Sequence, residues 1–390
     1  MNWTRIILLI FTLCLGYSSC KKSANTKKAS ITTANYSDYE SEWRKVDALE
    51  KKGLGKTIIA KVDSILNMAL KEENIPQIFK ALVYRSKYEN RIEEESSFKI
   101  LTQFELQIEE ASFPLKQLLH SATADLYYQY YNQNRWRFQQ RSQTTSFKKE
   151  DLRTWSLQDI LSKVNGHYQA SLLQKQDLLS FPTENLKDIL VPLNDQINDY
   201  GSIGLRPSLY DFLAGRALSY YSLNEGRVLT PHDQFNPDRY ALFSTSAVYS
   251  TFDFKTSDTN ASQLQTVLIF QELLKAHSKD VDPKVLINFD LKRLNYHHAN
   301  SNLENKDSLY LLALEALSSQ HEQNEAQAEI DYHIAKLFSN GGNRYSTSNP
   351  TAQWHLKKSH KICSKHAQKD SYGGKLCKIL LQQIEHKEFS

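Results

Sequence analysis

Apolar side chains recur at steps of three and four residues along most of the chain. An α-helix turns once every 3.6 residues, so such steps place the apolar side chains on one helical face. The pattern therefore predicts amphipathic helices of roughly 15–20 residues, joined by short polar turns. The recurring apolar positions of the first half include Trp43, Val46, Leu49, Ile58, Val62, Ile65, Leu82, Leu118, Ala122 and Leu126.

Prolines and capping residues indicate where several of these helices begin. Pro76, Pro114 and Pro207 each stand at the start of an apolar run, and proline is favoured in the first turn of a helix. Ser156 and Asp159 form an S-x-x-D sequence, which is typical of a helix N-terminus. These positions predict new helices after residues 75, 114, 156 and 207.

Glycine and proline are scarce. Together they make up 21 of the 390 residues, about 5% where average usage gives about 12%. Few residues are left to build tight turns or glycine-rich phosphate loops, which argues against a small β-sandwich or a dinucleotide-binding fold. We expect an all-α protein of antiparallel helical hairpins, stacked as a tetratricopeptide-like superhelix.

The helical pattern weakens in the middle of the chain. Residues 224–258 contain the β-prone string YALFSTSAVYSTFDF (240–254), so we interpret them as an irregular connector with a strand or two. It separates an N-terminal helical half, residues 39–223, from a C-terminal half, residues 259–390. Within the first half, Pro182 and Thr183 predict a helix that ends at residue 192.

The N-terminus has the form of an export signal. Residues 1–19 combine a positive residue, Arg5, with an apolar run of ten residues, 6–15. Ten residues are too few to span a bilayer, which takes about 20. Small residues then precede Cys20, as in bacterial lipoproteins, whose signal peptide ends just before a lipidated cysteine. An ordinary signal peptide, with Cys20 incidental, is the alternative.

Residues 20–38 are polar and lysine-bearing, and we interpret them as a flexible tether. In lipoproteins of the Bacteroidetes type an acidic stretch after the cysteine accompanies display on the cell surface. The basic residues here favour the periplasmic face of the outer membrane. The chain would then contact the membrane through its lipid, without spanning it.

Two cysteines remain in the body of the mature chain, Cys363 and Cys377. An oxidising compartment permits them to pair. We expect them on two closing helices, at about 350–368 and 373–387, at similar distances from the turn between them, so a disulfide fits the geometry of an antiparallel hairpin. The alternative is two thiols packed as small apolar groups between the helices.

Sequence motifs for catalysis, metals and cofactors are absent. The chain has no G-x-S-x-G, H-E-x-x-H, G-x-x-x-x-G-K-[ST] or G-x-G-x-x-G sequence. His297 and His298 are adjacent and should face different sides of a helix, and His355, His360 and His366 are poorly spaced for one metal on a helical face. We expect no enzyme activity, no metal and no cofactor.

A cluster of basic and aromatic residues follows the helix that begins at Pro114. It comprises Arg135, Trp136, Arg137, Phe138 and Arg141. Such a cluster can bind nucleic acid, but its arginines can equally pair with carboxylates or stack on aromatic rings. The net charge of only +4 and the export signal favour the second interpretation, so we expect no nucleic-acid partner.

Several strings, in order along the chain, resemble the N-terminal region of large bacterial alpha-2-macroglobulin-like proteins, notably those of Bacteroidetes. They are WRKVDALEKKGLGKTIIAKVDSIL (43–66), ENIPQIFKALVYR (73–85), RTWSLQDIL (153–161), LRPSLYDFLAGRAL (205–218), DSLYLLALEAL (307–317) and ICSKHAQKDSYGGKLCKILLQQIE (362–385). Gly215 departs from the polar residue expected there. In the resemblance, too, the closing hairpin carries a cysteine on each arm.

The resemblance implies endopeptidase inhibition by a complete protein with macroglobulin domains after this region. Neither Cys363 nor Cys377 begins the Cys-x-Glu-Gln thioester sequence, so covalent trapping of proteases is not expected here. We therefore expect a lipid-anchored helical scaffold that contacts proteases or other envelope proteins. The alternative is a free-standing helical-repeat lipoprotein of the outer membrane that binds a ligand or a partner protein.

Overall fold

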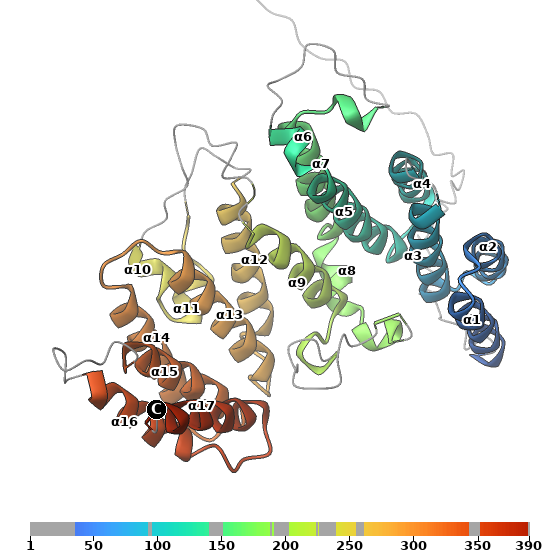
Figure 1. Ribbon diagram of the computed structural model, residues 1–390. Helices are drawn as coiled ribbons and strands as arrows, with labels where there is room; N and C mark the ends of the chain where they lie inside the picture. The colour runs from blue at the N-terminus through green and yellow to red at the C-terminus, as the bar shows by residue number, and fades with distance from the viewer. Residues whose placement is uncertain are drawn as a thin grey trace, which may run out of the picture.

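The computed structural model of the chain describes residues 36–92, 96–139, 151–187, 189–190, 203–223, 225, 239–254, 261–342 and 352–388. Within these residues the regular structure is helical, and the one strand-like pairing is an antiparallel bridge between Pro182 and Ser208. The helices stack on one another along the chain (Figure 1). The prediction of an all-α helical-repeat fold is confirmed.

Short turns join most of the helices. The first part of the chain forms α1 (Tyr36–Lys51), α2 (Gly55–Lys71), α3 (Ile75–Ile92), α4 (Ser96–Glu110), α5 (Leu115–Gln133), α6 (Arg135–Gln139), the 3₁₀ turn η1 (Leu152–Thr154), α7 (Leu157–Ser171), α8 (Lys175–Ser180), the 3₁₀ turns η2 (Thr183–Leu186) and η4 (Ile203–Leu205), and α9 (Leu209–Tyr221). The second part forms α10 (Arg239–Leu242), α11 (Ser246–Tyr249), α12 (Ser262–His277), α13 (Lys284–Asn300), α14 (Lys306–Gln320), α15 (Gln327–Gly342), α16 (Ala352–Ser364) and α17 (Tyr372–Glu388).

Side-chain caps fix the start of two of the longer helices. At α7 the Ser156 hydroxyl accepts a hydrogen bond from the Asp159 N–H, and the Asp159 carboxylate accepts one from the Ser156 N–H. The predicted capping box is therefore confirmed. Ser208 and Asp211 form a second capping box at α9, which satisfies N–H groups that a helix N-terminus otherwise leaves without partners.

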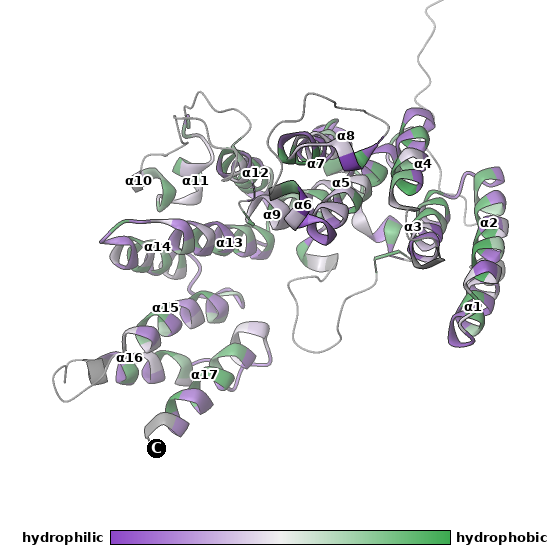
Figure 2. Cartoon of the chain, turned by 45° about the horizontal axis from the view of Figure 1, so that its top comes forward, coloured by the Kyte–Doolittle hydropathy of each residue, from purple (hydrophilic) through white to green (hydrophobic). Residues whose placement is uncertain are grey.

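The helices form an elongated, curved array. Figure 1 shows α1 and α2 at one end and the α16–α17 hairpin at the other. Along most helices, apolar and polar residues occupy different faces (Figure 2), as the three-to-four-residue period predicts. Buried apolar side chains form one cluster around α1–α5, a large middle cluster that includes both Tyr221 and Leu264, and a small cluster around Cys363 and Cys377.

The predicted strands within residues 240–254 are wrong. This segment forms the short helices α10 and α11, and side chains of α12 and α13 satisfy several of its carbonyl groups. Arg293 donates to the carbonyls of Leu242 (2.7 Å) and Ser244 (2.9 Å). Gln271 donates to those of Tyr249 (2.8 Å) and Phe252 (2.7 Å). Since tertiary contacts satisfy these groups, the segment needs no partner strand.

The predicted helix from Thr183 to residue 192 is also wrong in its described part. Only a 3₁₀ turn, Thr183–Leu186, forms there. The reason is pairing with the segment before α9: the Thr183 N–H donates to the Pro207 carbonyl (3.0 Å) and the Leu209 N–H donates to the Phe181 carbonyl (2.9 Å).

None of the described helices is both long and apolar enough to cross a membrane.

Candidate functional site

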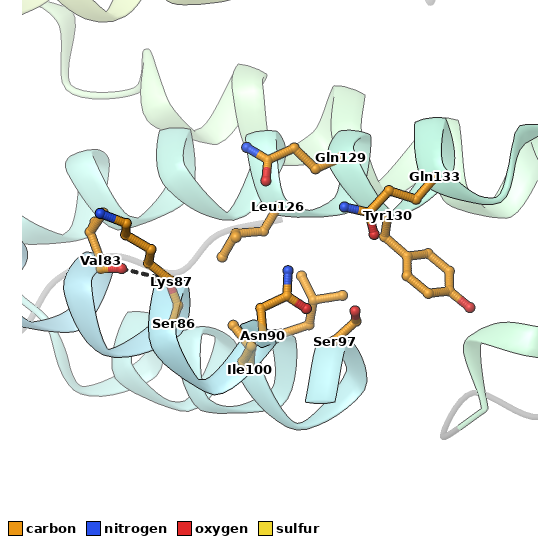
Figure 3. Close-up of a pocket in the computed structure, with 11 residues that line it drawn as sticks. Val83, Ser86, Lys87, Asn90, Ser97, Ile100, Leu126, Gln129, Tyr130 and Gln133 are labelled. Carbon is orange, nitrogen blue, oxygen red and sulfur yellow. Dashed lines mark hydrogen bonds between the residues drawn. The ribbon is translucent and has the colours of Figure 1, made fainter. Parts of the chain in front are cut away.

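A groove opens between α3, α4 and α5, with a cavity of about 460 Å³. Figure 3 shows residues from all three helices around it. Its apolar lining comes from Val83 of α3, Ile100 and Leu101 of α4, and Leu126 of α5. Val83 is exposed and Leu126 is half-buried, whereas Ile100 and Leu101 are buried, so Val83 and Leu126 supply the apolar surface that is open to a ligand.

Most polar groups of the groove are uncharged, and three of them are carboxamides. Asn90 comes from α3, and Gln129 and Gln133 lie one turn apart on α5. All three are exposed. Each carboxamide offers two N–H donors and one C=O acceptor, which are the same kinds of groups that a polypeptide main chain presents.

Lys87 is the one charged side chain among the residues that line the groove. Its ammonium group lies 2.9 Å from Oε1 of Glu50 on α1. It also stands 5.4 Å from the ring centre of Tyr84 and 5.3 Å from that of Tyr88. These contacts engage the Lys87 ammonium group within the protein. The groove therefore offers a ligand mainly apolar side chains and amides. Such a surface suits an extended polypeptide segment better than a strongly charged ligand.

A second cleft lies between α4, α5 and α7 and has a volume of about 520 Å³. It is lined by Glu105, His120, Trp155, Asp159, Ser162, Lys163, Gly166 and His167. The Glu105 Oε1 atom accepts hydrogen bonds from Lys163 Nζ (2.8 Å) and Tyr127 Oη (3.0 Å). His167 Nε2 lies 3.1 Å from the same oxygen, and His167 Nδ1 lies 3.0 Å from His120 Nδ1.

This cleft shifts the pKa values of its acid and base groups. Burial alone would raise the pKa of Glu105, but hydrogen bonds from His167 and Lys163, together with the positive charge of Lys163, hold it well below its usual range. Burial lowers the pKa of His120 to about 4, and the charge of Lys116, or a proton on the neighbouring His167, acts in the same direction. Burial and the Glu105 charge raise the pKa of Tyr127. Glu105 is therefore ionised and His120 neutral near pH 7.

Of the three cysteines predicted from the sequence as site residues, the structure brings two together. Cys20 lies outside the described residues. Cys363 on α16 and Cys377 on α17 are fully buried free thiols. The Cys377 thiol lies 3.9 Å from the Ala328 carbonyl. Its contact with the Cys363 thiol, together with burial, raises its pKa. The two thiols thus lie side by side between the helices, and the disulfide stays a prediction.

The histidines singled out in the sequence are dispersed. His297 is buried against the Tyr249 hydroxyl (3.0 Å), whereas His298 reaches Asp307 (2.7 Å), so the two face different sides as predicted. His366 contacts Asp331 (2.7 Å) and His360 contacts Glu385 (3.3 Å). Among the described residues, no three His, Cys, Asp or Glu side chains are arranged to hold a metal ion.

The basic and aromatic cluster is engaged within the protein where it is described. Arg135 forms an ion pair with Glu225 and stands 5.5 Å from the ring centre of Tyr131. Arg137 stands 5.1 Å from the ring centre of Trp136. Arg141 lies outside the described residues. Arg135 therefore both pairs with a carboxylate and stacks on a ring, and Arg137 stacks on a ring.

Neither the groove nor the second cleft was anticipated from the sequence. Glu105, His120 and His167 lie on three different helices and share no motif. Gln129 and Gln133 give one signal, because their four-residue spacing puts two amides on the same face of a helix. Comparison of the chain with protein-family models, with curated proteins and with solved structures finds no match.

Proposed function

We propose that the chain is a lipid-anchored helical scaffold that holds an extended polypeptide segment in the groove between α3, α4 and α5. The observation that carries this proposal is the lining of the groove: an apolar surface edged by the amides of Asn90, Gln129 and Gln133, with its one charged residue, Lys87, paired elsewhere. Such a lining can hydrogen-bond a main chain without selecting a charged side chain. The scaffold itself performs no catalysis.

The setting that we propose for it is the cell envelope. Cys20 would carry the lipid, and the chain would face the periplasm from the outer membrane. The resemblance of residues 43–66, 205–218 and 362–385 to alpha-2-macroglobulin-like proteins supports a place at the N-terminus of an endopeptidase inhibitor. In that setting the polypeptide held in the groove belongs to a protease, to another envelope protein or to a further region of the inhibitor.

A free-standing outer-membrane lipoprotein that binds a ligand or a partner is the second candidate. The same helical array and the same groove favour it. The two candidates differ in the gene: an open reading frame that continues past codon 390 into β-rich sequence selects the inhibitor, and a stop codon selects the free-standing lipoprotein.

Photocrosslinking in intact cells tests the groove. A photoreactive residue replaces Gln129, and in a matched control it replaces Gln323, an exposed glutamine in the turn between α14 and α15. We expect a defined envelope polypeptide to crosslink from position 129 and not from position 323. In the Gln129-probe background, Val83→Glu should abolish the adduct, because it places a charge on the apolar lining. Equal adducts from both positions, or an adduct that survives Val83→Glu, would contradict the proposal.

A further inference from the structure

The hydrogen bonds of the cleft between α4, α5 and α7 determine where its protons lie. An ionised carboxylate only accepts hydrogen bonds, so His167 must donate its Nε2–H to Glu105. The Nδ1 atoms of His167 and His120 then face each other at 3.0 Å, a distance at which one hydrogen lies between them. The chain Glu105–His167–His120 therefore links three helices through two shared hydrogens.

One added proton reverses the hydrogen-bonding role of His120. In the neutral pair, His120 Nδ1–H donates to His167 and leaves His120 Nε2 as a bare acceptor. Protonation at His120 Nε2 makes this atom a donor and keeps both internal hydrogen bonds. A second added proton would place two hydrogens between the facing Nδ1 atoms. The pair therefore takes up a single proton, and Glu105 lies beside the resulting positive charge.

The other polar groups of the cleft wall also offer donors. Lys163 has three N–H donors, one of which hydrogen-bonds to Glu105. Ser162 is exposed, one residue before it on the same helix. Two of the carboxylate oxygens are already engaged, and of these Glu105 Oε1 takes three hydrogen bonds. Asp159 Oδ2 takes the N–H (2.9 Å) and hydroxyl (2.6 Å) of Ser156.

The charges around the cleft are nearly balanced before the pair is protonated. Lys163 on α7 and Lys116 on α5 are positive, and Glu105 on α4 and Asp159 on α7 are negative. Tyr127 on α5 stays neutral. A proton on the histidine pair makes the cleft positive. Gly166 leaves the approach open, because a Cβ atom there would meet nothing within 4 Å.

We propose that this cleft binds a carboxylate group and takes up one proton from solvent on the His120–His167 pair as it does so. The carboxylate would accept hydrogen bonds from His120 Nε2, Lys163 and Ser162. It can come from the C-terminus of a polypeptide or from an acidic side chain. The proposal does not rest on the function assigned to the groove of Figure 3, whose lining residues are different.

Calorimetry of the whole mature chain with three short peptides tests the proposal. The peptides are acetyl-Ala-Ala with a free C-terminus, acetyl-Asp-Ala-amide, and the neutral acetyl-Ala-Ala-amide. At least one carboxylate peptide should bind, about ten-fold or more tightly at pH 5.5 than at pH 7.5. Titration in buffers with different ionisation enthalpies should show uptake of up to one proton. The peptide that binds identifies the source of the carboxylate.

Two histidine variants separate the cleft from a general effect of pH. His120→Gln should remove the proton uptake and make the affinity independent of pH. His386→Gln, which changes an exposed histidine on α17, should leave both unchanged. Imidazole ¹⁵N shifts of the unaltered protein give a readout that needs no variant: His120 Nε2 should become protonated when the peptide is added.

Several results would overturn the proposal. They are the absence of carboxylate binding at millimolar peptide, equal binding of the neutral amide, binding without proton uptake, and proton uptake that persists in His120→Gln. An unchanged His120 Nε2 shift in the presence of a bound carboxylate peptide would do the same. Circular dichroism at both pH values establishes that each protein compared is folded.

Discussion

His277 Nε2 lies 2.9 Å from Oδ1 of Asp211, although the two residues are 66 positions apart. Asp211 is fully buried, and its other oxygen closes the capping box of α9 with Ser208. His277 Nδ1 also lies 2.7 Å from Oδ2 of Asp280. Since both carboxylates accept, both ring nitrogens donate, and the imidazole is positively charged. It ties the end of α12 to the start of α9.

This contact predicts a specific pH dependence of stability. Burial lowers the pKa of His277, but the hydrogen bonds and charges of Asp211 and Asp280 outweigh it and raise the pKa. A raised folded-state pKa stabilises the protein fully below the unfolded pKa of about 6.5, and the stabilisation is lost as pH rises through the folded-state value. His277→Gln should therefore cost about 1–3 kcal/mol near pH 5.5 and clearly less at pH 9.

Urea unfolding of the unaltered chain and of His277→Gln from pH 5.5 to 9 measures this difference. His298→Gln is a suitable control, because His298 pairs with Asp307 at a partly exposed position. If the loss of unfolding free energy in His277→Gln grew with pH, the result would contradict a charged imidazole.

Arg293 should be essential for holding α10 and α11 on the array. Its guanidinium group is almost fully buried, pairs with Asp290 and donates to two carbonyls of residues 242–244. Arg293→Met leaves the buried Asp290 without its charge partner, so it should destabilise the chain by about 3–5 kcal/mol. Arg293→Lys can keep the ion pair but not both carbonyl contacts, and should cost less.

Hydrogen exchange of residues 240–254 locates the effect of both Arg293 variants. Faster exchange should appear in this segment even in Arg293→Lys, because at least one of the two carbonyl contacts is lost there. An Arg293→Lys protein with unchanged stability and exchange would show that the contacts are dispensable.

Two glycines should respond to alanine in opposite ways. A Cβ atom on Gly373 would lie 2.2 Å from the Glu329 nitrogen and 2.3 Å from the Ala328 carbonyl carbon, so α17 must shift away from α15. We expect Gly373→Ala to cost about 1–3 kcal/mol. At Gly166 a Cβ would meet nothing within 4 Å, so Gly166→Ala should stabilise α7 by about 0.5–1 kcal/mol. Thermal unfolding of both variants measures this difference in stability. Equal shifts of the two unfolding temperatures would contradict the prediction.

The thiols of Cys363 and Cys377 should be oxidised in protein isolated from the envelope. A bridge that closes a loop of about 15 residues stabilises a protein by about 3 kcal/mol in the chain-entropy model, so reduction should lower the stability by a comparable amount. Thiol counting on unfolded, unreduced protein checks this. Two free thiols per chain would leave the packing interpretation, in which both side chains simply fill the seam between α16 and α17.

Local sequence signals predicted the helices because those signals act over a few residues. Ser156 and Asp159 are three positions apart and form the predicted cap. The four-residue steps that begin at Ile58 and Val62 lie on the buried face of α2. The hairpin that brings Cys363 beside Cys377 could also be predicted, since the turn between them fixes their relative height.

Features that depend on distant residues could not be predicted in this way. Residues 240–254 have the composition of a strand, but Arg293 and Gln271, which lie outside the segment, hydrogen-bond to its carbonyls. Likewise, Glu105 and His167 are 62 positions apart and meet only because α4 and α7 pack beside α5. Their contact leaves no periodic or spacing signal in the sequence.

The proposal of an anchored scaffold depends most directly on Cys20. Intact-mass measurement of the protein extracted from the membrane fraction tests it, with Cys20→Ala as the control. We expect a mature chain that starts at Cys20 and carries a diacylglyceryl group and an added acyl chain. In the control we expect no lipid and no processing at this site. A chain cleaved elsewhere, or one that starts at Cys20 without lipid, would contradict the anchor and the envelope setting proposed with it.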